Sequence, residues 1–300
     1  MAHEHIWERL MAERWQPKSR KAIERDEKGP RSTTLSVKPV RKKHFISRWF
    51  IRDNWADGAK ATRWRWAEGD LERDEILFGA WGHREGLWDD RIEAYFGLLE
   101  NDGKLPIEML LATIPLNPPQ QEAFVAYLVI HMLRSPRFVL GLRAKLKDML
   151  DEAARDAEVS FDEMARRAYA SLFRQNEIYD AWARPILWSR WAIVTSEEPL
   201  FVLPDTFCAR SAVDGDAKII VPLTPTKCFV TLPSKEEEKR SVPFHVSADP
   251  ELARRISSLL IASADVDFLA HRAFTPSEVP TMLAFDEVLD ALEHSLNDRA

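Results

Sequence analysis

The side chains of this chain that are best suited to chemistry are one histidine, one arginine and three carboxylates, in four separated segments: His44, Glu93, Glu100, Arg134 and Asp205. Glu93 and Glu100 are seven residues apart, so on a helix they share one face about two turns apart. Carboxylates and a histidine are the ligand types of a divalent metal, or the members of an acid–base pair. An arginine beside them could hold a phosphate or a carboxylate.

Each of these residues also fits an ordinary structural role. Glu93 would be the third residue of a capping box that begins at Asp90, and Glu100 would be solvated near the end of the same helix. Arg134 suits the dipole at a helix C-terminus, and Asp205 is typical of a turn. A single histidine is more often packed or exposed than catalytic. The five residues are therefore candidates that only their positions in space can test.

No stronger chemical motif competes with them. The sequence has no glycine-rich phosphate loop, no nucleophile elbow and no Cys/His spacing typical of zinc. Its two cysteines, Cys208 and Cys228, are too few for a disulfide framework. We expect both to be reduced and buried in a sheet.

Charge is distributed unevenly along the 300 residues. The net charge is −6, yet residues 18–43 hold ten lysines and arginines against three acidic residues. We therefore predict a basic, partly disordered N-terminal arm over residues 1–41 and a single domain over residues 42–300. Such an arm could bind nucleic acid. The N-terminus lacks an apolar signal core and no apolar run reaches about 18 residues, so we expect a cytoplasmic protein without a membrane partner.

Helical periodicity dominates the middle of the chain. Apolar residues recur at helical spacing between residues 89 and 101, with Asp90 as the expected N-cap and Gly103 as the expected end. Ser160 and Glu163 indicate a second capping box. Further helices are predicted over residues 105–114, 118–135, 137–156 and 160–182.

After Pro185 the pattern becomes typical of short strands. Apolar and β-branched runs alternate with turn signals over residues 191–195, 200–203, 218–221 and 228–231. Outside that region we predict strands at 59–66 and 268–274 and helices at 249–261 and 285–296. Helices followed by clustered strands predict an α+β fold, in which a mainly helical middle packs on a small, largely antiparallel sheet from residues 190–232.

Four short motifs, in order, resemble those of one known family. The stretch from His44 to Arg52 resembles an opening "HxxPxxxLR" motif, and residues 92–100 resemble a helix with two glutamates. The stretch from His131 to Pro136 resembles a helix end "QxxRTP", and residues 200–205 with 221–225 resemble a sheet motif "FxTSDxP … PLSP". Over residues 42–275 the chain is thus similar to the family called domain of unknown function 4238.

The same comparison shows three departures. Ser47 stands where the family has proline, His131 where it has glutamine, and Leu203-Pro204 where it has Thr-Ser. If these polar positions belong to a site of the family, the resemblance implies that this site is altered here. It implies no particular reaction.

Two function classes follow. The first is a metal-assisted, nuclease-like hydrolase that acts on an anionic phosphodiester, for example in bacterial conflict or phage defence, with a divalent metal as its candidate cofactor. The second is a non-catalytic interaction protein, such as an antitoxin-like or immunity factor, that covers a protein partner with its acidic body. The clustered carboxylates, His44 and Arg134 favour the first class. The acidic body and the lack of a recognised catalytic motif favour the second. A catalytic protein would bring His44, Arg134 and Asp205, with at least one of Glu93 and Glu100, into one cleft between the helical middle and the sheet.

Overall fold

The centre of the fold is helix α5 (Pro118–Leu133), which is apolar on nearly every side. Every residue from Phe124 to Leu133 is buried. A helix that is hydrophobic all round is stable only when other elements surround it. Asn117 and Gln120 form a capping box at its N-terminus, and Pro118 takes the first helical position, where its missing N–H costs nothing.

The computed structural model describes residues 42–67, 70–173, 176–213, 216–232, 243–272 and 285–297, all within one compact unit of residues 41–300. The predicted basic arm over residues 1–41 lies outside the described residues. The predicted α+β class is confirmed: helices make up the middle of this unit, and small sheets follow and precede them.

Helix α4 (Asp90–Leu111) packs against α5. Its N-cap is Asp89, whose side chain accepts a hydrogen bond from the backbone N–H of Ile92, so the predicted cap at Asp90 was one residue late. The predicted end at Gly103 was wrong, because the helix continues through Gly103 and Pro106. At Gly103 the two helices approach so closely that a Cβ atom would lie 2.5 Å from Cβ of Tyr127.

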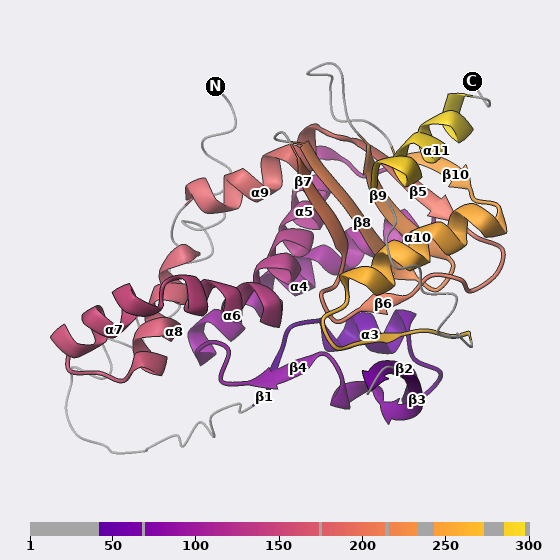
Figure 1. Cartoon of the computed structure of the whole chain (residues 1–300). Helices are drawn as coiled ribbons and strands as arrows, with labels where there is room; N and C mark the ends of the chain where they lie inside the picture. Colours follow the sequence, from indigo (N-terminus) through magenta and orange to yellow (C-terminus); the bar gives the residue numbers. More distant parts are fainter. Residues whose placement is uncertain are drawn as a thin grey trace, which may run out of the picture. The chain divides into compact units, whose positions relative to one another are not determined.

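The larger sheet has the strand order β10-β5-β9-β8-β7. All its pairs are antiparallel except β10 with β5, as predicted for a largely antiparallel sheet. Its strands are β5 (Arg190–Thr195), β7 (Ala209–Val213), β8 (Asp216–Thr224), β9 (Lys227–Leu232) and β10 (Phe244–Ser247). Phe124 of α5 packs edge-on against Trp191 and Phe229 of this sheet. Figure 1 shows α10 (Pro250–Ser263) and α11 (Phe285–Asn297) on the other side.

The sequence did not predict a second sheet, which has the order β3-β2-β11-β6. Its strands are β2 (Lys60–Ala67), β3 (Asp70–Leu77), β6 (Leu203–Pro204) and β11 (Asp267–Leu269). Strand β3 carries charges on both faces and is mostly exposed, so its sequence lacks the apolar alternation of a half-buried strand. Cross-strand ion pairs with β2 hold it: Arg63 with Asp74 at 2.9 Å and Lys60 with Glu75 at 3.0 Å.

The remaining elements frame the candidate site. The His44 segment forms β1 (Lys42–His44), which pairs with β4 (His83–Glu85), and continues into helix α3 (Arg48–Asn54). A short 3-10 helix covers Phe78–Ala80. Beyond α5 come α6 (Pro136–Lys145), α7 (Lys147–Asp156), α8 (Phe161–Leu172) and α9 (Asn176–Trp188). The single helix predicted over 137–156 is thus two helices that meet at Leu146.

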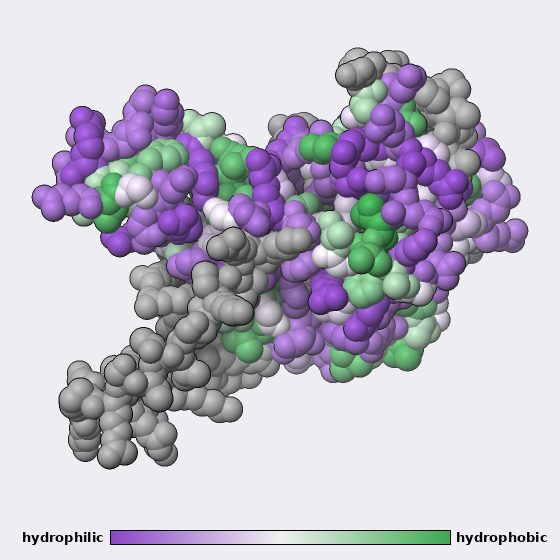
Figure 2. Space-filling model, turned by 90° about the horizontal axis from the view of Figure 1, so that it is seen from below, coloured by the Kyte–Doolittle hydropathy of each residue, from purple (hydrophilic) through white to green (hydrophobic). Residues whose placement is uncertain are grey.

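The surface is mostly hydrophilic on the face in Figure 2, where apolar side chains form small separate patches. Exposed large apolar residues occur singly on several elements, among them Leu98 and Leu105 on α4, Met149 on α7 and Trp188 on α9. Scattered exposed apolar residues are normal for folded proteins. Among the described helices none is by itself long and apolar enough to cross a bilayer; α5 and α6, which meet at 56°, reach that threshold only when taken together.

The contact between α4 and α5 yields a first prediction. Replacing Gly103 with Ala should destabilise the protein by more than about 1 kcal/mol, because the new methyl group overlaps Tyr127 and the helices must separate. The matched control is Gly97→Ala in the same helix, where a Cβ atom meets nothing within 4 Å. That change should stabilise the protein by about 0.5–1 kcal/mol through helix propensity. Urea unfolding measures both; equal effects of the two changes would contradict the tight contact.

Candidate functional site

Arg134, one of the five candidates, is a buried cation at the C-cap of α5, with 1% of its side chain exposed. Its Nε donates a hydrogen bond to the carbonyl oxygen of Phe45 at 2.9 Å, and Nη2 donates to Oγ of Ser47 at 3.1 Å. Nη1 forms an ion pair with Glu100 of α4. The guanidinium also lies over the ring of Phe96, 5.6 Å from its centroid. Arg134 therefore joins the His44 segment to α4 and α5, and its donors are occupied by the protein itself.

His131, one turn before Arg134, completes this network. The ring Nδ1 donates to the carbonyl oxygen of Tyr127 at 2.7 Å, while Nε2 accepts from the backbone N–H of Ser47 at 3.2 Å and from Arg134. Complete burial and the neighbouring arginine hold the pKa of His131 well below its usual value. His131 is thus a neutral hydrogen-bonding group, as the glutamine of the family motif would be. We name this set the Arg134 network: Phe45, Ser47, Glu100, His131 and Arg134.

His44 lies beside the Arg134 network but forms no hydrogen bond with it. It stands directly opposite His83 in the β1–β4 pair, with the ring centroids 5.5 Å apart and edge-on. The pKa of His44 is lowered to about 4, chiefly by burial; the charges of His83, Arg134 and Arg48 contribute to this shift, and Glu100 opposes it. The imidazole is therefore neutral near pH 7.

The two ring nitrogens of His44 differ. Nδ1 is buried and has no hydrogen-bond partner among the described residues. An unpaired buried N–H costs more than an unpaired lone pair, so the proton belongs on Nε2. The ring is partly exposed, which leaves Nε2 on its accessible side. His44 thus has polar capacity left for a ligand.

Glu93 lies on α4 in the first turn, two helical turns before Glu100. Its Oε2 accepts a hydrogen bond from Nε1 of Trp88 at 2.6 Å. Trp88 is buried and packs against Phe96 and Tyr169. This bond satisfies the indole N–H of a buried tryptophan, which is a structural use of the carboxylate.

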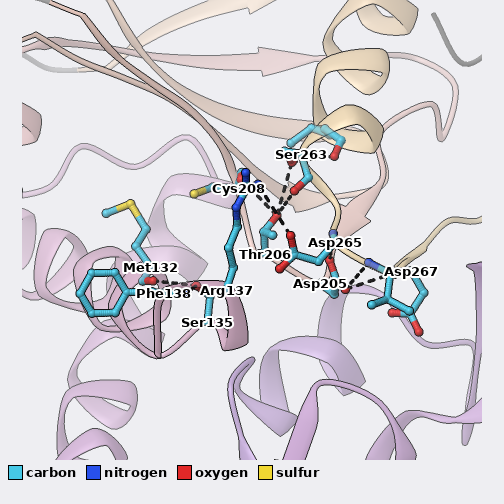
Figure 3. A network of polar contacts seen from close by, with 12 residues as sticks. Met132, Ser135, Arg137, Phe138, Asp205, Thr206, Cys208, Ser263, Asp265 and Asp267 are labelled. Carbon is cyan, nitrogen blue, oxygen red and sulfur yellow. Dashed lines mark hydrogen bonds and ion pairs between the residues drawn. The ribbon is translucent and has the colours of Figure 1, made fainter. Parts of the chain in front are cut away.

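Asp205 belongs to a second network, which Figure 3 shows. Its carboxylate accepts three backbone N–H bonds from the turn between α10 and β11: Asp265 at 2.7 Å, Val266 at 2.9 Å and Asp267 at 3.3 Å. Burial raises the pKa of Asp205 to about 6, against the opposing effect of these bonds. A carboxylate in such a cradle of successive N–H groups fixes the turn.

Neighbouring contacts extend this Asp205 network. Oγ1 of Thr206 donates to the carbonyl oxygen of Ser263 at 3.0 Å, at the end of α10. The Asp267 carboxylate accepts from Nε1 of Trp81 at 2.7 Å and lies 3.7 Å from Nη1 of Arg63. Arg137, in the first turn of α6, lies 3.7 Å from Asp265.

The α5–α6 junction therefore separates two polar networks. Arg134, before the junction, points into the Arg134 network, and Arg137, after it, reaches the Asp205 network. The structure brings together Arg134 and Glu100, with His44 within electrostatic reach of both. Glu93 and Asp205 instead contact Trp88 and the 265–267 turn. In the described part of the chain no group of three or more His, Cys, Asp or Glu side chains could hold a metal ion.

Sequence reasoning missed several members of these networks. In the sequence, Ser47 and His131 attract notice only as departures from the family motif. Nothing in the sequence marks Asp267 and Arg137, because their partners are distant in sequence.

Comparisons with protein-family models, curated proteins and solved structures found no match. The resemblance to domain of unknown function 4238 stays a prediction.

The buried position of Arg134 yields a second prediction. Arg134→Met should destabilise the protein by about 3–5 kcal/mol, because Glu100 and the Phe45 carbonyl lose their partner in a buried site. Arg134→Lys should recover only part of this, since one ammonium cannot reproduce the fork. The control is Arg184→Met, which removes an exposed pair with Asp180 and should cost less than about 1 kcal/mol. Denaturant unfolding measures the loss in free energy of unfolding for each variant. If Arg134→Met left this free energy unchanged, the result would contradict the network.

The two shifted groups predict opposite pH effects on stability. The pKa of Asp205 rises from 3.8 to about 6, so between these values the folded state binds more protons, and this group stabilises the fold less as pH rises. The pKa of His44 falls from 6.5 to about 4, so in that window the unfolded state binds more protons, and stability falls as pH falls.

Unfolding measurements at several pH values separate these effects. Asp205→Asn should remove the loss of stability that wild type shows as pH rises. The free energy of unfolding of this variant, relative to wild type, should therefore increase by about 1–3 kcal/mol from pH 4 to 6.5. His44→Gln should remove the second, so its relative stability improves as pH falls. The exposed Asp286→Asn is the control and should follow wild type. Parallel curves for all variants would refute both shifts.

Proposed function

We propose that the protein acts on an anionic substrate of the phosphodiester class, with His44 as the residue that exchanges a proton with it. One observation carries the proposal: His44 is neutral and partly exposed, and no described group bonds its ring. An accessible imidazole is the commonest proton-transfer group in enzymes.

The surroundings of His44 favour an anion. Arg48 is exposed and lies within electrostatic reach of His44, and its guanidinium packs over the ring of Phe78 at 5.3 Å. It has no ion pair among the described residues. The charge of Arg134 is compensated by Glu100, whereas Arg48 has no such partner among the described residues and can attract an anionic substrate. An anion bound there would raise the pKa of His44 towards the range useful for catalysis.

Activity assays test this proposal directly. His44→Gln should lower hydrolysis of bis(p-nitrophenyl) phosphate or of short oligonucleotides by about a hundredfold or more, with the fold intact, because the side chain makes no described hydrogen bond. Assays with and without Mg²⁺ or Mn²⁺ test whether a metal assists the reaction. Arg48→Gln should raise KM more than it lowers kcat, since Arg48 would bind charge rather than transfer a proton.

His245→Gln serves as the matched control, because His245 lies exposed on β10. It should leave the rate unchanged. A rate that survives His44→Gln, or no hydrolysis of any phosphodiester by the wild type, would remove the enzyme proposal.

A second function has its own support: a non-catalytic interaction protein. Arg134, Glu93 and Asp205 all form hydrogen bonds with groups of the protein itself. Residues used in this way stabilise a scaffold, as an antitoxin-like or immunity factor requires. This class predicts that Glu93→Gln and Asp205→Asn change the free energy of unfolding, and that the wild type hydrolyses no phosphodiester. Loss of activity without loss of stability in these variants would argue against it.

A further inference from the structure

A second histidine faces His44 across the β1–β4 strand pair. His83 is the direct partner of His44 in the antiparallel register, and the two ring centroids lie 5.5 Å apart, edge-on. Side chains alternate between the two faces of a strand, so both imidazoles lie on one face, whereas Lys43 and Arg84 lie on the other. Both rings are half-buried. The fold therefore presents two imidazoles side by side, each with part of its ring accessible to solvent.

The segments that carry the two histidines are bonded to each other. The carbonyl oxygen of Gly82 accepts hydrogen bonds from the backbone N–H groups of Phe45 at 2.8 Å and Ile46 at 3.2 Å. Gly82 has a φ angle of 68°, in the left-handed region that glycine adopts most readily. These bonds hold the residues that follow His44 against the residue that precedes His83. Imidazoles on such a scaffold are already positioned for a ligand.

Most of the charges around the histidine pair cancel. Arg134, which lies within electrostatic reach of His44, forms an ion pair with Glu100. On the opposite face of β1, the buried ammonium group of Lys43 pairs with Asp90. Each of these cations is thus offset by a carboxylate.

The other charged residues near the pair leave an excess of cations. Glu85 of β4 stands opposite Lys42 of β1 in the strand register, so these two residue types have opposite charges. Arg48 and Arg84 are exposed, and neither forms an ion pair among the described residues. The Arg48 guanidinium lies over the ring of Phe78, 5.3 Å from its centroid, in the segment just before β4. An anion that approaches the two histidines therefore meets a net positive charge.

We propose that His44 and His83 form an acid–base pair that cleaves RNA, with the 2′-hydroxyl group of the substrate as the nucleophile. This inference rests on the proposed function at His44 and names its substrate class. RNA carries a hydroxyl beside each phosphate, which DNA lacks, so two proton-transfer groups suffice for cleavage. Each imidazole must come within about 2.6–3.2 Å of the oxygen with which it exchanges a proton. The attacking and leaving oxygens share one phosphorus atom, and rings 5.5 Å apart are close enough to serve both.

The two histidines have different roles in this reaction. The accessible Nε2 of His44 carries its proton, which makes His44 the acid, and a phosphate bound there favours a second proton on the ring. His83 accepts the proton of the 2′-hydroxyl while the 2′-oxygen forms a bond to phosphorus. The bond from phosphorus to the 5′-oxygen breaks, its electron pair stays on that oxygen, and His44 supplies the proton. The products are a 2′,3′-cyclic phosphate and a 5′-hydroxyl end, and proton exchange with water restores both rings.

The test compares a short RNA with the same sequence as DNA and as 2′-O-methyl RNA, in buffer that contains EDTA. Wild type should cleave the RNA to a 2′,3′-cyclic phosphate, identified by mass spectrometry, and should cleave the other two at least about a hundredfold more slowly. His83→Gln and His44→Gln should each lower the rate on RNA by about a hundredfold or more. His245→Gln is the control, since this histidine lies exposed on β10, and it should leave the rate unchanged.

An RNA with sulfur in place of the 5′-bridging oxygen separates the two roles. Its thiolate leaves without needing a proton, so His44→Gln should regain most of its rate on this substrate. His83→Gln should stay slow, because the 2′-hydroxyl still needs a base. A variant that is slow only because it unfolds would be equally slow on both substrates.

Three results would overturn this inference and leave a His44-dependent enzyme: equal cleavage of RNA and its 2′-O-methyl form, a wild-type rate in His83→Gln, or no recovery of His44→Gln on the sulfur substrate. The comparison of substrates with wild type decides the question even if His83→Gln does not fold. If wild type cleaved no phosphodiester at all, the proposed function itself would fail.

Discussion

The rest of the described structure depends on one buried cation. Arg134 lies where the apolar helix α5 ends, and an unpaired guanidinium there would be too costly to bury. Its partners come from two other segments: the Phe45 carbonyl and Ser47 hydroxyl before α3, and the Glu100 carboxylate of α4. The cation therefore requires these segments to meet at the end of α5. Buried ion pairs often add little net stability, yet they do not tolerate a missing partner, so they favour one arrangement over its alternatives.

Asp205 joins segments in the second half of the chain, as Arg134 does in the first half: each is a buried charged side chain whose partners lie far away in sequence. Its carboxylate organises a turn about sixty residues later in sequence, between α10 and β11. Strand β11 then pairs with both β6 and β2, so the turn that Asp205 holds also joins N-terminal and C-terminal strands in one sheet. The cost is a buried negative charge whose pKa is raised to about 6. The bonds from three N–H groups offset part of this cost.

Local patterns predicted much of the fold because they depend on neighbouring residues. The cap at Ser160, the helix after Asp249 and the α+β class needed only spacing and residue type. Gly103 misled the prediction because glycine is poor in an isolated helix, whereas contact with Tyr127 makes it necessary in this one. Strand β3 escaped prediction because its charges pair across to β2, which no single-strand pattern records.

The candidate site shows the same division. Residue types and motif order selected Arg134 and Glu100, which do meet, and His44 beside them. Residue type and motif order could not reveal that Glu93 binds Trp88 or that Asp205 binds backbone groups. The sequence gives the identity of a carboxylate residue but not whether its partner is a substrate or another part of the protein.

The charged strand β3 also affects whether molecules of the protein associate with one another. It is the outer strand of its sheet in the described structure, and an edge of eight residues with open backbone groups invites another strand to add to it. An apolar strand that added there would place its side chains beside these charged groups, which are unfavourable neighbours for them. The same ion pairs that make β3 hard to recognise in the sequence should thus discourage molecules from joining edge to edge, both during folding and afterwards in a crowded solution.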